Sequence, residues 1–252
     1  MKKIICILLC LAMVVFCAAC GEEKKDDSSA KSDGDVVETE APTEEEIEHP
    51  VSADWFNDAV FVGDSITLKL SYYCENNPSA LGEAEFFCAG SLGYNSALWD
   101  IDDPNAVHPY YRGEVQLTEY CAEKTESDKV FIMLGMNDIG MYGVDGAAQA
   151  CKELVNRILS HTPDVKIYME STTPMLAAFE YGDLNNSNVD KFNEWLKQFC
   201  EENGYKYMDI NSIMRDETGA LKYEYCSDPD AMGIHFTDSA CAMWVDYLKN
   251  HV

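Results

Sequence analysis

Apolar runs of strand length alternate with longer segments of helical periodicity through most of this chain. The run at residues 129–134 is apolar at every position after its first, which is typical of a strand buried on both faces of a sheet. Strands that alternate with helices imply a parallel sheet covered by helices on both faces, so we expect an α/β fold with three layers, α/β/α. The expected strands are 59–62, 84–88, 129–134, 165–170 and 205–210, and the expected helices are 65–77, 145–162, 188–203 and a last one that Thr237 caps and that ends at Leu248.

The first expected strand runs into Gly63-Asp64-Ser65, which places a serine where a strand gives way to a helix. The first turn of a helix has free backbone N–H groups, so the Ser65 hydroxyl would lie beside donors suited to an oxyanion. Ser65 is therefore a candidate nucleophile, although serine also favours the simpler role of a helix N-cap. A nucleophile elbow of the G-x-S-x-G type is excluded, because Thr67 occupies the place of its second glycine.

Three later blocks carry groups that complement a serine: a glycine-containing loop with Gly93, the sequence Gly-x-Asn-Asp with Asn137, and a late histidine, His235. Ser65, Gly93 and Asn137 follow the first three expected strands. Ligands of parallel sheets bind outside the carboxyl ends of the strands, so we expect these residues to meet at one edge. A serine, an amide and a histidine are the parts of an acyl-transfer site.

These four blocks, in this order, resemble the SGNH (GDSL-type) hydrolase family, and the resemblance runs from about residue 59 to the C-terminus. It implies a flavodoxin-like sandwich with a central parallel sheet. It also implies that Ser65 is the nucleophile and that the oxyanion hole consists of the Ser65 N–H, the Gly93 N–H and the Asn137 side chain. Asp64 would then support the turn.

Within the glycine block, the donor must approach the tetrahedral oxygen closely, and a side chain would obstruct it. The resemblance assigns this role to Gly93 and a turn to Gly90, and the reverse assignment stays open. A loop asparagine such as Asn137 is often only a turn former. Asp138 is expected to order the loop.

The resemblance makes His235 the general base, which activates Ser65 and later protonates the leaving group. The family pattern has an aspartate three residues before this histidine, where the chain has Met232. Either Asp230 or Asp228 reaches His235 by another path, or a backbone carbonyl orients the imidazole and the enzyme works as a dyad. We place Asp230 among the candidate catalytic residues. The spacing slightly favours the dyad.

Residues 1–19 form an expected signal peptide, in which Lys2 and Lys3 precede sixteen apolar residues. That run is shorter than the ~20 residues of a membrane span. Ala18-Ala19-Cys20 is similar to the cleavage and lipidation site of a bacterial lipoprotein, although Cys17 stands where leucine is usual. We expect export and a lipid anchor on Cys20 at the outer face of the cell membrane. A plain secreted protein or an uncleaved anchor is the alternative.

Residues 20–50 form an expected tether, because 21–50 hold twelve acidic and three basic residues and almost no large apolar groups. Such a segment cannot bury enough surface to offset the entropy of ordering. The remaining 51–252 suit one hydrolase domain. Of the total charge of −27, Lys2 and Lys3 contribute +2 and the tether −9, which leaves −20 for the domain. This charge argues against nucleic acid or anionic lipid as a partner.

Seven cysteines follow Cys20, and an odd number cannot all pair within the chain. Cys88, Cys151 and Cys200 fall on apolar faces of expected elements, where a free cysteine packs as a small hydrophobe. No metal-ligand spacing is present. We therefore expect no metal and no cofactor.

The expected function is a serine esterase of the cell surface, which removes short acyl groups such as acetyl from a carbohydrate or cell-wall polymer. Two alternatives stay open. An O-acyltransferase would use the same site, and a non-catalytic lipoprotein would bind glycans in a retained cleft, which the loss of aspartate at Met232 would explain. The partners are then an acylated carbohydrate or small ester, and the membrane through the lipid anchor only. We expect a monomer.

Overall fold

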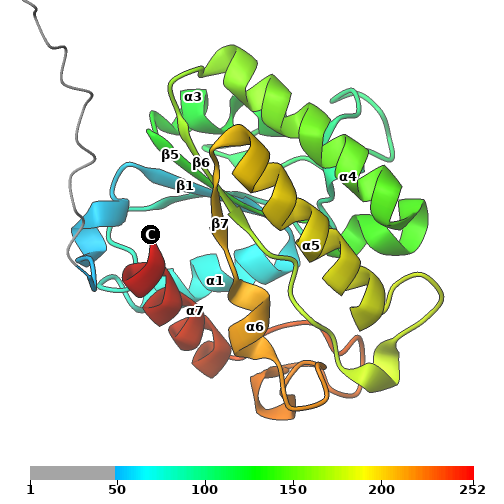
Figure 1. The fold of residues 1–252 in the computed structure, drawn as a ribbon. Helices are drawn as coiled ribbons and strands as arrows, with labels where there is room; N and C mark the ends of the chain where they lie inside the picture. Colours follow the sequence, from blue (N-terminus) through cyan, green and yellow to red (C-terminus); the bar gives the residue numbers. More distant parts are fainter. Residues whose placement is uncertain (1–48) are drawn as a thin grey trace, which may run out of the picture. The chain divides into compact units, whose positions relative to one another are not determined.

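The computed structural model describes residues 49–252, and Figure 1 shows their fold. The expected signal peptide, Cys20 and nearly all of the expected tether lie outside the described residues. Among the described residues, no helix has the length and apolar character that crossing a bilayer requires.

The core of the fold is a five-stranded sheet in the order β2-β1-β5-β6-β7. All four strand pairs are parallel. The predicted α/β fold with a central parallel sheet is thereby confirmed. The strands are β1 (Ala59–Gly63), β2 (Glu85–Cys88), β5 (Lys129–Met133), β6 (Lys166–Glu170) and β7 (Lys206–Met208).

Helices cover both faces of the sheet, as Figure 1 shows. One layer contains α3 (Cys121–Thr125), α4 (Met136–His161) and α5 (Asn186–Asn203), and the other contains α1 (Ser65–Asn76), α6 (Ile210–Met214) and α7 (Asp238–His251). The side-chain period of two in a strand sends Val60 and Val62 of β1 into the first layer and Phe61 into the second. Both faces of the central strands are therefore buried.

An aromatic stack crosses the second layer. The rings of Phe61 on β1 and Phe131 on β5 stack with centroids 4.6 Å apart, and Phe131 stacks on Tyr168 of β6 at 4.4 Å. Burying a phenylalanine side chain contributes about 1.5–3 kcal/mol to stability. This stack holds in register the strands that carry the site at their carboxyl ends.

Helix α4 begins earlier than the sequence predicts. The expected start was residue 145, whereas the helix begins at Met136 and is interrupted at Gly143, where φ is 67° and ψ is 178°. A glycine tolerates this non-helical conformation, so the chain forms two helical pieces that are almost continuous. Asn137 consequently lies in the first turn of a helix and not in a loop.

Residues 94–113 contain one short helix, α2 (Tyr94–Ala97), and the first strand of a hairpin formed by β3 (Tyr110–Tyr111) and β4 (Glu114–Val115). Tyr94 is fully buried, and its ring lies 6.0 Å from that of Phe192 on α5. The start of the segment is therefore packed into the first helical layer.

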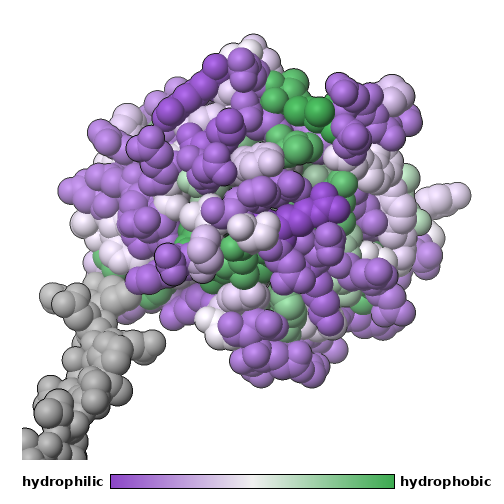
Figure 2. Space-filling model, turned by 90° about the horizontal axis from the view of Figure 1, so that it is seen from above, coloured by the Kyte–Doolittle hydropathy of each residue, from purple (hydrophilic) through white to green (hydrophobic). Residues whose placement is uncertain are grey.

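The seven cysteines of the described region are free, and five of them are buried. Figure 2 shows a mostly hydrophilic face on which hydrophobic residues form small groups. Thr237 caps α7 as predicted, with its hydroxyl oxygen accepting the Ala240 N–H at 3.4 Å.

Candidate active site

Ser65 is the first residue of α1, directly after the carboxyl end of β1. The residue before it, Asp64, is the N-cap, and its Oδ1 accepts the Ile66 N–H at 2.8 Å. The interpretation of Ser65 as the cap is therefore wrong. Because Asp64 caps the helix, the Ser65 hydroxyl is available for another partner.

That partner is His235. The Oγ of Ser65 and the Nε2 of His235 are 2.9 Å apart, although 170 residues separate them along the chain. His235 lies in the loop that precedes α7, and 27% of its side chain is exposed. A small substrate can therefore reach the pair from solvent.

Asp228 occupies the position behind His235. Its Oδ2 lies 2.7 Å from the Nδ1 of His235, and its Oδ1 accepts the backbone N–H groups of Ile234 and His235, both at 3.1 Å. Asp230 is exposed, and the carboxylate bonded to the imidazole belongs to Asp228. The inclusion of Asp230 and the preference for a dyad are both corrected: the side chain that orients His235 is Asp228.

The chain reaches this geometry by folding the loop back on itself. Cys226 and Phe236 form an antiparallel bridge, and the Ser227 N–H donates to the His235 carbonyl at 2.8 Å. Gly233, with φ of 68°, turns the chain between them. An aspartate seven residues before the histidine thereby lies beside it.

The electrostatics of Asp228 suit this position. Partial burial raises the pKa of its carboxyl. The hydrogen bonds from His235 and Cys226 lower this pKa by more than burial raises it, so the net pKa lies below its usual value. Asp228 is therefore ionised at neutral pH and accepts the Nδ1 proton of His235. This tautomer leaves the lone pair of Nε2 facing the Ser65 hydroxyl.

The three candidate oxyanion donors lie on neighbouring segments. The side-chain Nδ2 of Asn137 donates to the carbonyl of Leu92 at 3.0 Å, so it touches the peptide unit that carries the Gly93 N–H. The same Nδ2 lies 3.3 Å from Oδ2 of Asp64, the neighbour of Ser65. Ser65, Gly93 and Asn137 therefore line one edge of the sheet, as the sequence predicts.

The Gly93 N–H has a partner that the sequence-based prediction missed. It donates to Oγ of Ser96 at 3.0 Å, which lies one helical turn further along α2. An incoming oxyanion would compete with this hydroxyl for the N–H. The signal was present as a serine three residues after the N-cap position, where side chains commonly bond back to the cap.

Asp138 fixes the Gly93 loop against the start of α4. Its carboxylate accepts the N–H of Tyr94 at 2.8 Å and the backbone and side-chain N–H groups of Asn95, both at 2.9 Å. A Cβ at Gly93 would lie 2.8 Å from the same carboxylate, so only glycine fits here. The predicted role of Asp138 in ordering the loop agrees with this geometry.

Two buried carboxyl groups lie at the site. Burial raises the pKa of Asp64 to about 7, and the Ile66 N–H and the charge of His235 oppose this rise. Burial likewise raises the pKa of Asp138 above its usual value, against the hydrogen bonds from Asn95 and Tyr94. The region behind Ser65 is consequently a dry environment, in which hydrogen bonds are stronger than in water.

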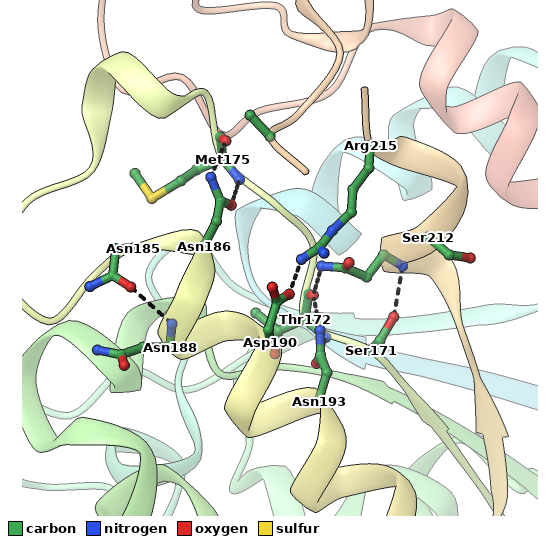
Figure 3. Close-up of polar contacts among 12 residues, drawn as sticks. Ser171, Thr172, Met175, Asn185, Asn186, Asn188, Asp190, Asn193, Ser212 and Arg215 are labelled. Carbon is green, nitrogen blue, oxygen red and sulfur yellow. Dashed lines mark hydrogen bonds and ion pairs between the residues drawn. The ribbon is translucent and has the colours of Figure 1, made fainter. Parts of the chain in front are cut away.

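Buried amide side chains, which Figure 3 shows, hold the segment that follows β6. Asn193 accepts the Thr172 N–H at 2.9 Å and donates to the Thr172 carbonyl at 2.8 Å. Asn186 makes the same pair of bonds with Met175, both at 2.9 Å. Every polar group of the backbone at these two positions is thus satisfied although no sheet partner is present.

This segment also sets the turn before Asn137. The hydroxyl of Thr172 donates to the Leu134 carbonyl at 2.6 Å, and a Cβ on Gly135 would lie 2.5 Å from that hydroxyl oxygen. Gly135 has φ of 116°, which glycine alone adopts readily.

In the described region no group of three or more His, Cys, Asp or Glu side chains could hold a metal ion.

A family model, described as the GDSL-like Lipase/Acylhydrolase family, matches residues 61–242. The chain belongs to this family. The matched range contains Ser65, Gly93, Asn137 and His235, and it spans both helical layers of the sandwich. The prediction of an enzyme that hydrolyses ester bonds is confirmed at the level of the family.

Solved structures share the family fold. A GDSL-like lipase from Bacteroides thetaiotaomicron matches with a TM-score of 0.57 and 15% identity over 81% of this chain and 90% of its own. A lipase/acylhydrolase from Enterococcus faecalis matches with a TM-score of 0.55 and 13% identity over 76% and 93%. A variant of an acetyl-xylooligosaccharide esterase from Geobacillus stearothermophilus matches with a TM-score of 0.51 and 16% identity over 75% and 90%.

Curated relatives match only in part. An N-acylneuraminate cytidylyltransferase from Streptococcus agalactiae serotype V is 32% identical over 144 residues, which are 54% of this chain and 32% of that protein. The protein of the same name from serotype III is 32% identical over 113 residues, 44% of this chain and 25% of its own length. The chain therefore spans a quarter to a third of these relatives.

Proposed function

We propose that this GDSL-family chain is a serine esterase that removes short acyl groups, such as acetyl, from a carbohydrate or cell-wall polymer. The observation that carries the proposal is the continuous hydrogen-bonded chain from Ser65 Oγ through His235 to Asp228, with distances of 2.9 and 2.7 Å. Both links fall within the reach that proton transfer between a nucleophile and its base requires.

In the proposed reaction, Ser65 Oγ attacks the acyl carbon and its proton passes to Nε2 of His235. The negative oxygen of the tetrahedral intermediate takes hydrogen bonds from the Ser65 N–H, the Gly93 N–H and Asn137 Nδ2, which exchanges its longer bond to Asp64, 3.3 Å, for the bond to this oxygen. His235 then protonates the departing alcohol oxygen as the bond from it to the acyl carbon breaks. Water, deprotonated by His235, attacks the acyl carbon of the acyl-enzyme. The bond from the acyl carbon to Ser65 Oγ then breaks, and His235 returns the proton to Oγ as the acid leaves.

Asp228 removes the main reason to regard the chain as a non-catalytic module. Met232 suggested a site without its carboxylate, but Asp228 offers a carboxylate to the same imidazole nitrogen. Its charge stabilises the imidazolium that forms when Ser65 is deprotonated. We therefore favour the catalytic function over glycan binding in a retained cleft.

A carbohydrate as the acyl carrier has support from proteins that this chain resembles. The partial curated relatives are named for N-acylneuraminate, an acylated sugar, and one protein of the same fold is named as an acetyl-xylooligosaccharide esterase. The charge of −20 on residues 51–252 favours a neutral ester over an anionic lipid or nucleic acid. Cytidylyl transfer is not part of the proposal, since the chain matches only a third of that relative or less.

We also propose that the protein is exported and anchored through lipidated Cys20, with residues 21–50 as a tether. The support is the sequence pattern of the first twenty residues. Labelling with a palmitate analogue, compared between the full chain and a Cys20→Ala variant, tests this proposal. Equal labelling of both proteins would refute it.

The catalytic proposal is tested with a fluorophosphonate probe and with p-nitrophenyl acetate. An activated serine forms a covalent adduct with the probe, whereas ordinary serines do not react. We expect one adduct per chain, located on the peptide that contains Ser65, and hydrolysis of the acetate ester. Acid release compared with transfer to an added sugar distinguishes the hydrolase from an O-acyltransferase. A folded chain that neither labels nor hydrolyses the ester would exclude both.

A further inference from the structure

A groove of about 550 Å³ runs along the edge of the sheet, between helix α1 and edge strand β2. Its wall on α1 is formed by Leu68, Ser71, Tyr72 and Glu75. These residues recur at intervals of three and four, so they share one face of the helix. Ser65 stands three residues before Leu68, and the groove therefore begins within one helical turn of the candidate nucleophile.

The floor of the groove also leads to the site. Phe86 and Cys88 of β2 line it, and Cys88 is aligned with Gly63 of β1, two residues before Ser65. The Asp64 carboxyl is close enough to Cys88 for its charge to add to the effect of burial, which raises the pKa of that thiol. Both the helix wall and the strand floor thus end beside Asp64 and Ser65.

The opposite wall is the β3–β4 hairpin, which is fixed to β2. Arg112 in its turn pairs with Glu85 at 3.0 Å, and the Tyr111 ring packs 5.3 Å from that of Phe87. Because successive side chains of a strand point to opposite sides, the burial of Tyr111 (8% exposed) turns Tyr110 (69% exposed) outward into the groove. Tyr110 and Tyr72 then line the same open groove from its two walls.

The chemistry of these walls selects the ligand. Tyr72 is 50% exposed, so the rings of Tyr72 and Tyr110 both present flat apolar faces to solvent. A ligand that stacks on these rings would remove this apolar surface from water, which is favourable. Glu75 and Glu85 supply carboxylate oxygens, which accept hydrogen bonds from hydroxyl groups. None of the lining residues is basic, and the guanidinium of Arg112 beside the groove is already paired with Glu85, so the lining favours a neutral ligand over an anionic one.

We propose that this groove binds the sugar chain of a neutral polysaccharide, with Tyr72 and Tyr110 stacking on sugar rings while the acylated unit lies at Ser65. The inference deepens the proposed esterase function and rests on it for the identity of the acylated unit. The groove itself can be tested without any catalytic step.

The first experiment measures binding with the full chain carrying Ser65→Ala. Isothermal titration with unacetylated xylohexaose, cellohexaose and chitohexaose should show binding of at least one of them. Adding Tyr72→Ala or Tyr110→Ala should weaken that binding about tenfold, since each removes one stacking contact. Tyr223→Ala, which removes a tyrosine of similar exposure (66%) outside the groove, should leave it unchanged. No binding of any hexasaccharide, or equal losses in all three variants, would overturn the proposal.

The second experiment measures kcat/KM on the O-acetylated form of the hexasaccharide and on p-nitrophenyl acetate. Tyr72→Ala and Tyr110→Ala should lower the first value about tenfold and leave the second unchanged, because the small ester does not reach the groove. Equal losses on both substrates would overturn the groove proposal and leave the esterase standing. If the wild type hydrolyses neither ester, the esterase proposal fails, while the titration still decides the groove. Thermal unfolding of each variant checks that the fold survives.

Discussion

Oδ2 of Asp228 lies 2.7 Å from Nδ1 of His235, and Oδ1 of the same carboxylate accepts the His235 backbone N–H at 3.1 Å. One aspartate therefore fixes both the backbone and the ring of the histidine. This double hold compensates for the methionine at position 232, where the family pattern has its aspartate.

Asp228→Asn should lower kcat steeply, by up to about 10⁴-fold as for the corresponding change in a serine protease. An amide donates from its nitrogen, so it forces the His235 proton onto Nε2 and removes the lone pair that accepts from Ser65. The matched control is Asp230→Asn, which alters an exposed carboxylate and should retain the wild-type kcat. Steady-state hydrolysis of p-nitrophenyl acetate measures both. A large defect in Asp230→Asn alone would mean that Asp230, and not Asp228, serves His235.

Met232→Asp should leave kcat nearly unchanged. Residue 232 is 54% exposed, and Nδ1 of His235 already has a carboxylate partner. An exposed carboxylate contributes little through a screened, solvated interaction. The assay is again ester hydrolysis, in the wild-type background and in Asp228→Asn. A marked gain in the wild-type background would mean that Asp228 does not serve His235 in solution.

Ser65→Ala should abolish both fluorophosphonate labelling and ester hydrolysis, with a loss of about 10⁴-fold or more in kcat. The fold should survive, because Asp64 and not Ser65 caps α1. Circular dichroism and thermal unfolding serve as controls for structure. A variant that keeps a tenth of the activity would be incompatible with a covalent mechanism at Ser65.

Asn137→Ala should lower kcat by about 10²–10³-fold with little change in KM, as expected for the loss of one oxyanion donor. The variant also frees the Leu92 carbonyl and the Asp64 carboxyl, so its stability needs to be measured in parallel. An unchanged kcat in a stable variant would limit Asn137 to its structural contacts with Leu92 and Asp64.

Glu170→Gln should stabilise the protein at high pH. Glu170 is fully buried, its Oε1 accepts the Trp244 N–H at 2.7 Å, and burial raises its pKa from 4.5 to about 8. The folded state therefore binds the Glu170 proton more tightly than the unfolded state does. Stability from this group is fully present below pH 4.5 and is lost as the pH rises through about 8.

Glutamine keeps the acceptor for Trp244 without a charge to bury. The difference in unfolding free energy between variant and wild type should grow between pH 5 and pH 9, on the order of a few kcal/mol. Urea unfolding at both pH values measures it. Asp64 titrates in the same direction in both proteins, so it cancels in this comparison. A difference that is independent of pH would show that Glu170 is not protonated in the folded state.

The sequence determined the order of strands and helices, because burial on two faces leaves uninterrupted apolar runs such as the one in β5. It also determined that Ser65, Gly93 and Asn137 share one edge, since parallel strands all end on the same side. Element boundaries were less well determined. The start of α4 was missed by nine residues, because a glycine with positive φ interrupts the helical periodicity at Gly143.

Only the tertiary structure decided which carboxylate serves His235. The choice between Asp228 and Asp230 depends on a bridge between Cys226 and Phe236 and on the turn at Gly233, which together fold residues 226–236 into a closed loop. The spacing of residues along the chain does not show that the loop closes in this way. The same holds for the groove beside α1, where Tyr72 and Tyr110 come together because the β3–β4 hairpin is tied to β2 by Arg112 and Glu85. Local patterns fix which residues face the core, whereas contacts between distant segments depend on how those faces pack.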